Sequence, residues 1–242
     1  MFGMEHAQQR LQQQKKTVTT DTGNFTLTAG NVANGTYQTL YEVGKLKELT
    51  LTYDTGMTET IDVEIVGIDH DNLADGTGKA GLTFIVKEMP FITSPMNSGS
   101  TSNSGGWNST YMRSSTIQTV YNALPEELRN VIKPVIKKAS AGSKSSDIVE
   151  STDSVWIPSY IEICADASST GSVYTNEGET YSIYASNSDR QKYKTDGVTL
   201  STYWTRSPVA NSMYGFWYVT SNGELTTFGS DSSMGVAFGF CI

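Results

Sequence analysis

The stretch TLSTYWTRSPVANSMYGFWYVTSNGELTTFGSDSSMGVAFGFCI, residues 199–242, contains the clearest β-sheet pattern of the chain. Aromatic and aliphatic residues alternate there with glycines and small polar residues, which is typical of short strands joined by tight turns. Asn222-Gly223 lies between two such runs and predicts a two-residue β-hairpin. The apolar run 235–242 predicts a last strand that is inserted into a sheet rather than left free.

Similar patterns precede this stretch. Residues 49–53 and 61–66 alternate apolar and polar side chains around a Gly-containing turn, so they predict a hairpin. The near-continuous apolar run 82–86 predicts a strand buried on both faces, and residues 155–158 predict an aromatic strand. A helix is expected from Trp107 to Leu124, and a second from Pro125 to Lys138 that is kinked or split at Pro134.

These elements predict an α+β fold of twisted antiparallel sheets, with two or three packed helices and long loops. Residues 1–40 are expected to form a separate N-terminal arm. Its first sixteen residues are Gln-rich and compatible with a frayed helix, while residues 17–38 are rich in Thr, Gly and Asn and predict extended chain. Such an arm is too small to form its own core. It is either a flexible leader or an arm for oligomerisation or docking on a particle.

Composition excludes several classes of protein. The formal net charge of −8 argues against nucleic-acid binding, which requires a basic surface. No apolar run approaches the roughly 20 residues of a membrane helix, so no membrane insertion is expected. The first residues lack the cationic and apolar regions of a secretory signal, and we expect cytoplasmic synthesis.

Catalytic motifs are missing from the sequence. No nucleophile elbow, zinc-protease, phosphate-loop or dinucleotide-binding pattern occurs, and we predict a protein that is not an enzyme and has no cofactor. Four acidic residues are nominal candidates for a glycosidase pair but do not differ in spacing from surface acids: Glu162, Asp166, Glu177 and Glu179. Residues 69–72 (Asp-His-Asp-Asn) are interpreted as a turn rather than a metal site. Cys164 and Cys241 are interpreted as inert thiols rather than a disulfide.

Ordered motifs resemble a family of unknown-function domains that is common in phages and prophages of Gram-positive gut bacteria. The family is related to the C-type lectin and formylglycine-generating-enzyme-like fold. The resemblance covers residues 41–242. It rests on these motifs: Val43-Gly-Lys45, Ile65-Val-Gly-Ile-Asp-His-Asp-Asn72, Lys79-Ala-Gly-Leu-Thr-Phe84, Gly105-Gly-Trp-Asn-Ser-Thr-Tyr-Met-Arg113, Leu124-Pro-Glu-Glu-Leu128, Asp153-Ser-Val-Trp-Ile157, Glu177-Gly178, Trp204-Thr-Arg-Ser-Pro208, Phe216-x-x-Val219-x-x-x-Gly223 and Gly235-Val-Ala-Phe-Gly-Phe-Cys-Ile242.

The resemblance implies a C-type-lectin-like ligand-binding domain over residues 41–242, with its ligand-binding face in the C-terminal stretch. In some phage members this stretch is varied by diversity-generating retroelements. We therefore expect a receptor-binding or variable protein on a virion surface or tail tip, which binds a host-surface protein or glycan. By analogy with the family it would be a homo-oligomer, such as a trimer. The alternative is a structural virion decoration or tail-adaptor protein whose partners are other virion proteins.

A strand over residues 216–221 with Val219 pointing inward predicts the contact surface. The predicted ligand-binding residues are Phe216, Tyr218 and Thr220 on the strand, with Thr205, Asn211 and Tyr214 beside it. The predicted scaffold comprises Trp204, Arg206, Pro208, Val236, Phe238 and Phe240, with Arg206 as a buried hydrogen-bonding residue. A shift of one residue in register would invert the two faces.

Overall fold

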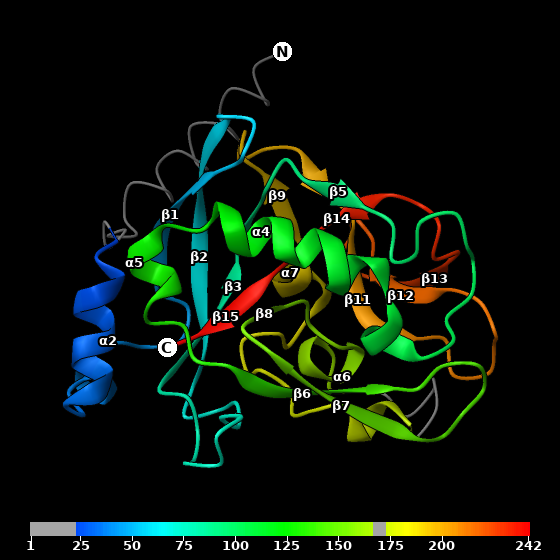
Figure 1. The fold of residues 1–242 in the computed structure, drawn as a ribbon, viewed down its shortest axis with the longest axis horizontal. Helices are drawn as coiled ribbons and strands as arrows, with labels where there is room; N and C mark the ends of the chain where they lie inside the picture. Colours follow the sequence, from blue (N-terminus) through cyan, green and yellow to red (C-terminus); the bar gives the residue numbers. More distant parts are fainter. Residues whose placement is uncertain (1–22, 167–172) are drawn as a thin grey trace.

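The computed structural model describes residues 23–166 and 173–242, and its fold is α+β with more sheet than helix (Figure 1). The first sheet has five strands in the order β1-β2-β3-β15-β8, and every neighbouring pair is antiparallel. Its strands are β1 (Leu46–Thr52), β2 (Thr58–Ile68), β3 (Leu82–Val86), β15 (Gly239–Cys241) and β8 (Val155–Trp156).

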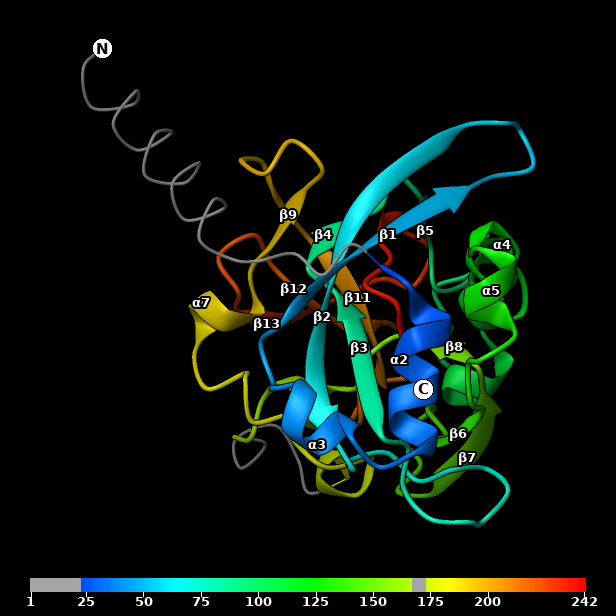
Figure 2. The same ribbon diagram turned by 90° about the vertical axis from the view of Figure 1, so that its left-hand side faces the viewer.

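The predicted hairpin and third strand are confirmed. β1 and β2 pair across the turn at Gly56, which has a φ of 81° and therefore favours glycine. This hairpin projects from the body of the molecule in Figure 2. All five residues of β3 are buried, because the sheet is covered on both faces at this point.

The end of the chain occupies an interior position in the first sheet, as predicted. β15 lies between β3 and β8, and Leu82 and Ile242 exchange backbone hydrogen bonds of 3.0 and 2.9 Å. The rings of Phe84 and Phe240 stack with centroids 5.1 Å apart. A Cβ at Gly239 would lie 2.7 Å from the Phe84 carbonyl oxygen, so this close strand approach requires glycine.

The second five-stranded sheet has the order β13-β12-β11-β14-β5. The predicted hairpin is confirmed, with β12 and β13 joined through Asn222 and Gly223, whose φ is 79°. All six residues of β11 are buried, and β11 pairs with β12 antiparallel and with β14 parallel. The strands are β5 (Thr93–Ser94), β11 (Tyr203–Pro208), β12 (Phe216–Val219), β13 (Leu225–Phe228) and β14 (Met234–Gly235).

Two small sheets complete the β structure: β10-β9-β4 and β6-β7. Their strands are β4 (Glu88–Met89), β6 (Val135–Ser140), β7 (Ile148–Asp153), β9 (Lys192–Lys194) and β10 (Leu200–Ser201). The predicted second helix is wrong beyond Arg129. Pro134 cannot donate a helical hydrogen bond, and the β-branched residues after it favour a strand that pairs with β7.

Helices are short and lie outside the sheets (Figures 1 and 2). They are α2 (Phe25–Ala33), α3 (Tyr37–Leu40), the 3₁₀ turn η1 (Gly106–Ser109), the π-helical turn η2 (Met112–Thr116), α4 (Ile117–Ala123), α5 (Glu126–Arg129), α6 (Tyr160–Ile163), the 3₁₀ turn η3 (Tyr174–Asn176) and α7 (Asn187–Arg190). The helical stretch predicted from Trp107 to Leu124 is therefore confirmed in its main part. Among the described residues, no helix is long and apolar enough to span a bilayer.

The extended conformation predicted for residues 17–38 is wrong for residues 25–33, which form α2, and for residues 37 and 38, which begin α3. Asn24 begins α2, because its side-chain oxygen accepts a hydrogen bond of 2.9 Å from the Leu27 N–H. Phe25 then packs against Phe84 and Phe240 at centroid distances of 6.0 and 5.8 Å. Burial of this ring, which sequence alone does not reveal, anchors α2 on the first sheet. The rest of the predicted arm, residues 1–22, lies outside the described residues.

The Phe25 contact predicts that α2 contributes to the stability of the whole domain. We expect Phe25→Ala to lower the free energy of unfolding by about 3–5 kcal/mol, because it leaves a cavity against Phe84 and Phe240. Leu27→Ala on the same helix is the control and should change stability by no more than about 0.5 kcal/mol, since Leu27 is 61% exposed. Denaturant unfolding measures both. Equal effects of the two substitutions would contradict the packing of α2.

Candidate functional site

A buried chain of ion pairs connects four segments that are distant in the sequence. The Lys137 ammonium of β6 lies 2.5 Å from Asp71 Oδ1, in the loop after β2, and 3.0 Å from Glu162 Oε1 on α6. Arg206 of β11 holds the same Glu162 carboxylate through two hydrogen bonds of 2.6 and 2.7 Å. All four side chains are buried. The network therefore fixes the relative positions of four segments by charge-assisted hydrogen bonds.

Arg206 uses every N–H of its guanidinium. Besides Glu162, it donates to the backbone carbonyl oxygens of Lys138, Ile157 and Glu177 at 2.9, 2.8 and 3.0 Å. These five bonds account for the five donors of the side chain. The prediction of Arg206 as a buried hydrogen-bonding residue is thus confirmed, and the partners explain why the charge is tolerated without solvent.

The Lys137 ammonium makes further contacts that sequence reasoning missed. Its Nζ lies 3.4 Å from the ring centroid of Trp156, a cation–π contact, and donates to the Tyr181 hydroxyl at 3.1 Å. The Tyr181 hydroxyl donates in turn to the Asp71 carboxylate. One signal was available in the sequence, because Val135, Lys137 and Ala139 share a face if this segment is read as a strand.

The network controls the ionisation of its acids. Burial opposes the charged form of Asp71, but the Lys137 ammonium holds the pKa of this carboxyl well below its usual value. For Glu162 burial acts in the same way, and Arg206 and Lys137 outweigh it and lower the pKa. Glu177 differs: burial raises its pKa to about 7, although Ser207 and the Ser140 N–H bond to its oxygens. The pKa of Glu177 is therefore raised, whereas the pKa values of Asp71 and Glu162 are lowered.

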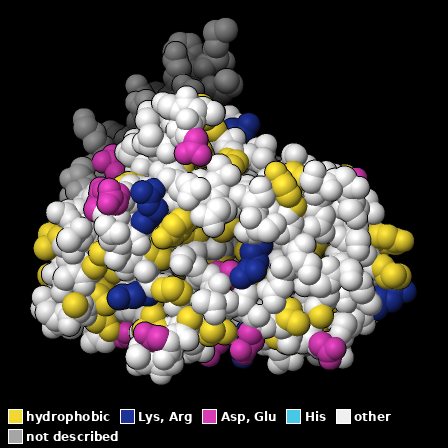
Figure 3. Space-filling view, in the orientation of Figure 1, with side chains coloured by type: hydrophobic (Ala, Val, Ile, Leu, Met, Phe, Trp, Pro, Cys, Tyr) yellow, Lys and Arg dark blue, Asp and Glu magenta, His cyan; other side chains and the backbone are white. Residues whose placement is uncertain are grey.

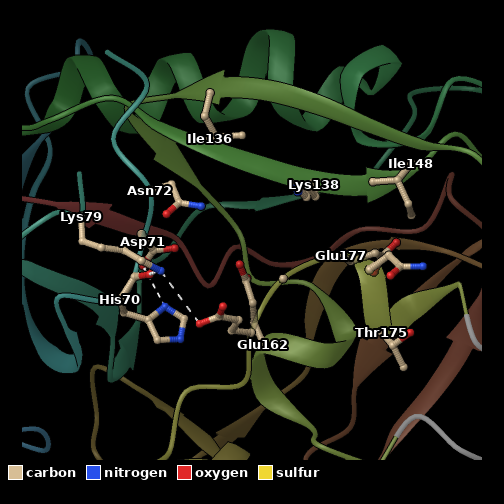
Figure 4. A pocket seen from close by; sticks show the side chains of 13 residues that line it. His70, Asp71, Asn72, Lys79, Ile136, Lys138, Ile148, Glu162, Thr175 and Glu177 are labelled. Carbon is tan, nitrogen blue, oxygen red and sulfur yellow. Dashed lines mark hydrogen bonds and ion pairs between the residues drawn. The ribbon is translucent and has the colours of Figure 1, made fainter. Parts of the chain in front are cut away.

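A pocket of about 530 Å³ opens beside the network. Figure 4 shows His70, Asp71 and Glu162 on one side of the pocket, with Lys138 and Ile148 of β6 and β7 on the other. Both oxygens of Glu162 already bind cationic partners within the protein. Among the acids that line this pocket, Asp71 and Glu162 therefore balance internal charges of the network.

The nominal acid candidates fall into different environments. Glu162 and Glu177 are buried near each other, whereas Glu179 is exposed at the pocket rim, 4.0 Å from the Lys79 ammonium. Asp166 is exposed. No grouping of three or more His, Cys, Asp or Glu side chains within residues 23–166 and 173–242 has an arrangement suited to a metal ion.

The segment interpreted as a turn is a bend over residues 69–71, followed by a β-bridge between Asn72 and Lys79. Asp69 has a left-handed φ of 50°, and its carboxylate accepts hydrogen bonds from the Tyr37 hydroxyl and the Gln38 amide. Both cysteines are free thiols; Cys241 is buried and Cys164 half-buried. Burial raises the pKa of the Cys241 thiol well above its usual value, so this group stays protonated and unreactive.

The six predicted contact residues are not all on the surface. Asn211 and Tyr214 are exposed in the loop between β11 and β12, and Tyr218 and Thr220 are half-buried. Phe216 and Thr205 are buried, so their predicted exposure is wrong. The predicted scaffold residues are all buried: Trp204, Arg206, Pro208, Val236, Phe238 and Phe240.

The cause of this error is that β12 is covered on both faces. On one face Trp217 packs against the rings of Tyr160 and Tyr174, and its indole N–H donates to the Tyr174 hydroxyl at 2.8 Å. On the other face Tyr218 packs edge-on against Trp204 and Phe228. Alternation along a strand predicts an outward face only when one side of the sheet meets solvent.

Exposed apolar side chains nevertheless gather at this end of the molecule. Met213, Tyr214 and Phe228 are 50%, 59% and 53% exposed. Phe228 pairs with Phe216 across β12 and β13, and the Gly215 position directly adjoins the Phe228 carbonyl. Figure 3 shows hydrophobic side chains at the edge of the molecule where β12 and β13 lie in Figure 1. We call Asn211, Met213, Tyr214, Tyr218 and Phe228 the C-terminal surface.

Comparison with known protein families assigns the chain to one of them. Residues 80–242, more than half of the chain, match the sequence model of a domain of unknown function, DUF6273. The chain belongs to the DUF6273 family. No curated protein and no solved structure matches it.

The DUF6273 match includes Lys137, Glu162 and Arg206 and the whole C-terminal surface, but it begins after Asp71. The β1–β2 hairpin also precedes the match, yet it pairs with β3 in one sheet. The DUF6273 region therefore depends on earlier residues for a strand neighbour and for one carboxylate of its ion-pair network.

The hydrogen bonds of Arg206 predict that lysine cannot replace it. We expect Arg206→Lys to lower the free energy of unfolding by about 3 kcal/mol or more, since an ammonium leaves buried acceptors and part of the Glu162 charge unpaired. Arg113→Lys is the matched control: Arg113 pairs with Asp153 but its side chain is 30% exposed, and the loss should stay below about 1 kcal/mol. Thermal and denaturant unfolding measure both variants; wild-type stability of Arg206→Lys would refute the role given to the network.

The raised pKa of Glu177 predicts a pH dependence of stability. Between pH 4.5, the ordinary value, and about 7, the folded protein holds a proton that the unfolded chain has released. Stability should therefore fall as pH rises through this window, by on the order of 3 kcal/mol in total, and this contribution should be constant above about pH 7.

Glu177→Gln isolates this contribution, because an amide accepts from the Ser140 N–H and donates to Ser207 without titrating. The stability difference between variant and wild type, measured by denaturant unfolding from pH 4 to 8, should change in favour of the variant as pH rises. Glu179→Gln, at an exposed position, is the control and should give a flat difference. A flat difference for Glu177→Gln as well would contradict the raised pKa.

Proposed function

We propose that this DUF6273 protein is a non-enzymatic recognition protein that binds a molecule of a host-cell surface through its C-terminal surface. The supporting observation is the pairing of an exposed loop with a rigid support. Met213 and Tyr214 project from the loop after β11, whose six residues are all buried. Binding loops carried on a rigid scaffold are a common design in recognition proteins, and exposed aromatic residues provide contact area at low entropic cost.

The buried carboxyl groups are already bonded within the protein, which favours a binding function over a catalytic one. An acid–base mechanism needs a carboxyl group within reach of a substrate. Glu162 is bound on both oxygens by Lys137 and Arg206, and Glu177 has no exposed surface. Neither Glu162 nor Glu177 is therefore presented to a substrate as an exposed carboxylate.

The finer features of the proposal rest on the sequence resemblance. We propose a C-type-lectin-like arrangement of the sheets, a phage or prophage origin, and a place on the virion surface or tail tip as a homo-oligomer. In this proposal the C-terminal surface belongs to the part of the chain that retroelements diversify in some relatives, and its partner is a host receptor.

A second candidate, a structural virion protein, is favoured by a different observation. Leu27 on α2 and Leu40 on α3 are 61% and 56% exposed, on helices away from the C-terminal surface. Exposed leucines on short surface helices suit a contact with another virion subunit.

A binding experiment distinguishes the two functions. The purified protein is added to a panel of intact Gram-positive gut bacteria, beside the double variant Met213→Ala/Tyr214→Ala. We expect at least about tenfold weaker binding of the variant with an unchanged melting temperature, because both side chains are exposed in the free protein and would be buried by the partner.

Leu27→Ala/Leu40→Ala is the matched control, with the same kind of truncation at equally exposed positions, and it should bind as the wild type does. Loss of particle incorporation in this control, with no cell binding by any variant, would favour the structural role instead. Addition of EDTA should leave binding unchanged, since Asp69 and Asp71 are already bound by protein groups.

A further inference from the structure

Three loops from distant parts of the sequence meet around one buried amide. They are residues 97–104, the β6–β7 turn 141–147, and the loop 209–215 that carries Met213 and Tyr214. Asn103, which is fully buried, lies between them. No sequence motif identified this residue.

Asn103 bonds to both of the other loops. Its side-chain nitrogen lies 3.4, 3.2 and 3.1 Å from the carbonyl oxygens of Val209, Ser212 and Gly215. Its backbone N–H donates to the Met213 carbonyl at 3.1 Å. Loop 209–215 is thus held at its beginning, middle and end by a single residue.

The same residue holds the β6–β7 turn. Asn103 Oδ1 accepts a hydrogen bond of 2.8 Å from the Ser143 N–H. Gly142 has a φ of 70°, and a Cβ there would lie 1.9 Å from the Asn103 carbonyl oxygen. The backbones therefore touch, and only glycine permits this approach.

Loop 97–104 has additional contacts with the C-terminal stretch. The Gly215 N–H donates to the Thr101 carbonyl at 3.0 Å, and Ser102 forms a β-bridge with Tyr214. The Ser230 hydroxyl lies within 3.1 Å of the carbonyl oxygens of Ser100 and Ser102. The exposed Thr101 and the exposed Tyr214 therefore belong to one continuous surface.

The chemistry of this surface restricts its partner. Across the three loops the only charged residues are Lys144 and Asp147, one of each sign. A phosphate- or carboxylate-rich polymer needs several cations for binding. Exposed Met and Tyr among Ser, Thr and Asn side chains instead match the composition of interfaces with proteins.

We infer that the three loops form one contact surface for a protein partner, and that Asn103 is the positioning residue that holds this surface in shape. The inference rests on the proposed recognition function and extends it: the partner covers residues 97–104 and 141–147 as well as the C-terminal surface.

Arginine substitutions test the extended surface. Thr101→Arg and Ser146→Arg place a bulky charge at exposed positions of the two additional loops. Each should weaken binding to the bacterial cells about tenfold or more without a change in melting temperature, since a buried unpaired charge opposes docking. Thr55→Arg, in the β1–β2 turn, is the control and should bind as wild type. Wild-type binding by both loop variants would overturn the extended surface, even where Met213→Ala/Tyr214→Ala abolishes binding and the proposed function stands.

Asn103→Asp tests the positioning role. Aspartate keeps the size of the side chain and the acceptor for Ser143, but it replaces the donor that faces three carbonyl oxygens. We expect amide hydrogen exchange in residues 209–215 to accelerate about tenfold or more, with exchange in β2 and β3 unchanged, and cell binding to weaken. Unchanged exchange in residues 209–215 would overturn the role of Asn103, and this readout requires no ligand.

Treatment of the bacteria tests the class of partner. Protease treatment of the cells should abolish binding, and periodate oxidation of their glycans should leave it intact. The reverse result would assign a glycan and overturn the protein partner. Failure of the wild-type protein to bind any untreated cell would reject the proposed function together with the extended surface, whereas the exchange measurement would still decide the role of Asn103.

Discussion

The buried guanidinium of Arg206 holds together segments that are far apart in the sequence. A charge without solvent is costly unless all its donors are bonded and an opposite charge is close. Arg206 meets both conditions through Glu162 and three backbone carbonyls that belong to β6, the β8–α6 connection and the segment after η3. Because each partner must be in place for the charge to be tolerated, these segments are fixed together with β11.

The buried network gives the loop of residues 209–215 a rigid support. The loop after β11 starts from a strand that has no exposed residue, and it returns into β12, which aromatic rings cover on both faces. Asn103 and the Tyr174 hydroxyl, from other segments, bind backbone groups between Pro208 and Gly215. The loop backbone is therefore held while its side chains at Met213 and Tyr214 remain free. Side chains on such a loop can change without cost to the core, which suits a surface that selects partners.

Local sequence patterns predict the structure correctly where a short segment determines its own conformation. Alternation and Gly-containing turns are local properties, and they predict the hairpins over residues 49–66 and 216–228 correctly. The helical pattern of residues 135–140 predicts the wrong structure, because strand pairing with residues 148–153 outweighs it next to Pro134. The packing of Phe25 is not predicted, because its contacts, Phe84 and Phe240, are far away in the sequence.

The α+β class and the insertion of the terminal strand follow from the sequence alone, because hydrophobic periodicity and turn residues act over a few residues. Tertiary contacts decide which side chains of β12 face solvent, which acids are paired, and that Asn103 joins three loops. These properties depend on contacts between residues such as Asp71 and Lys137, or Asn103 and Gly215, that are separated by long stretches of chain. No local sequence pattern shows whether a strand is buried on both faces or which residue pairs with a buried charge. Both properties arise only from contacts in the folded chain.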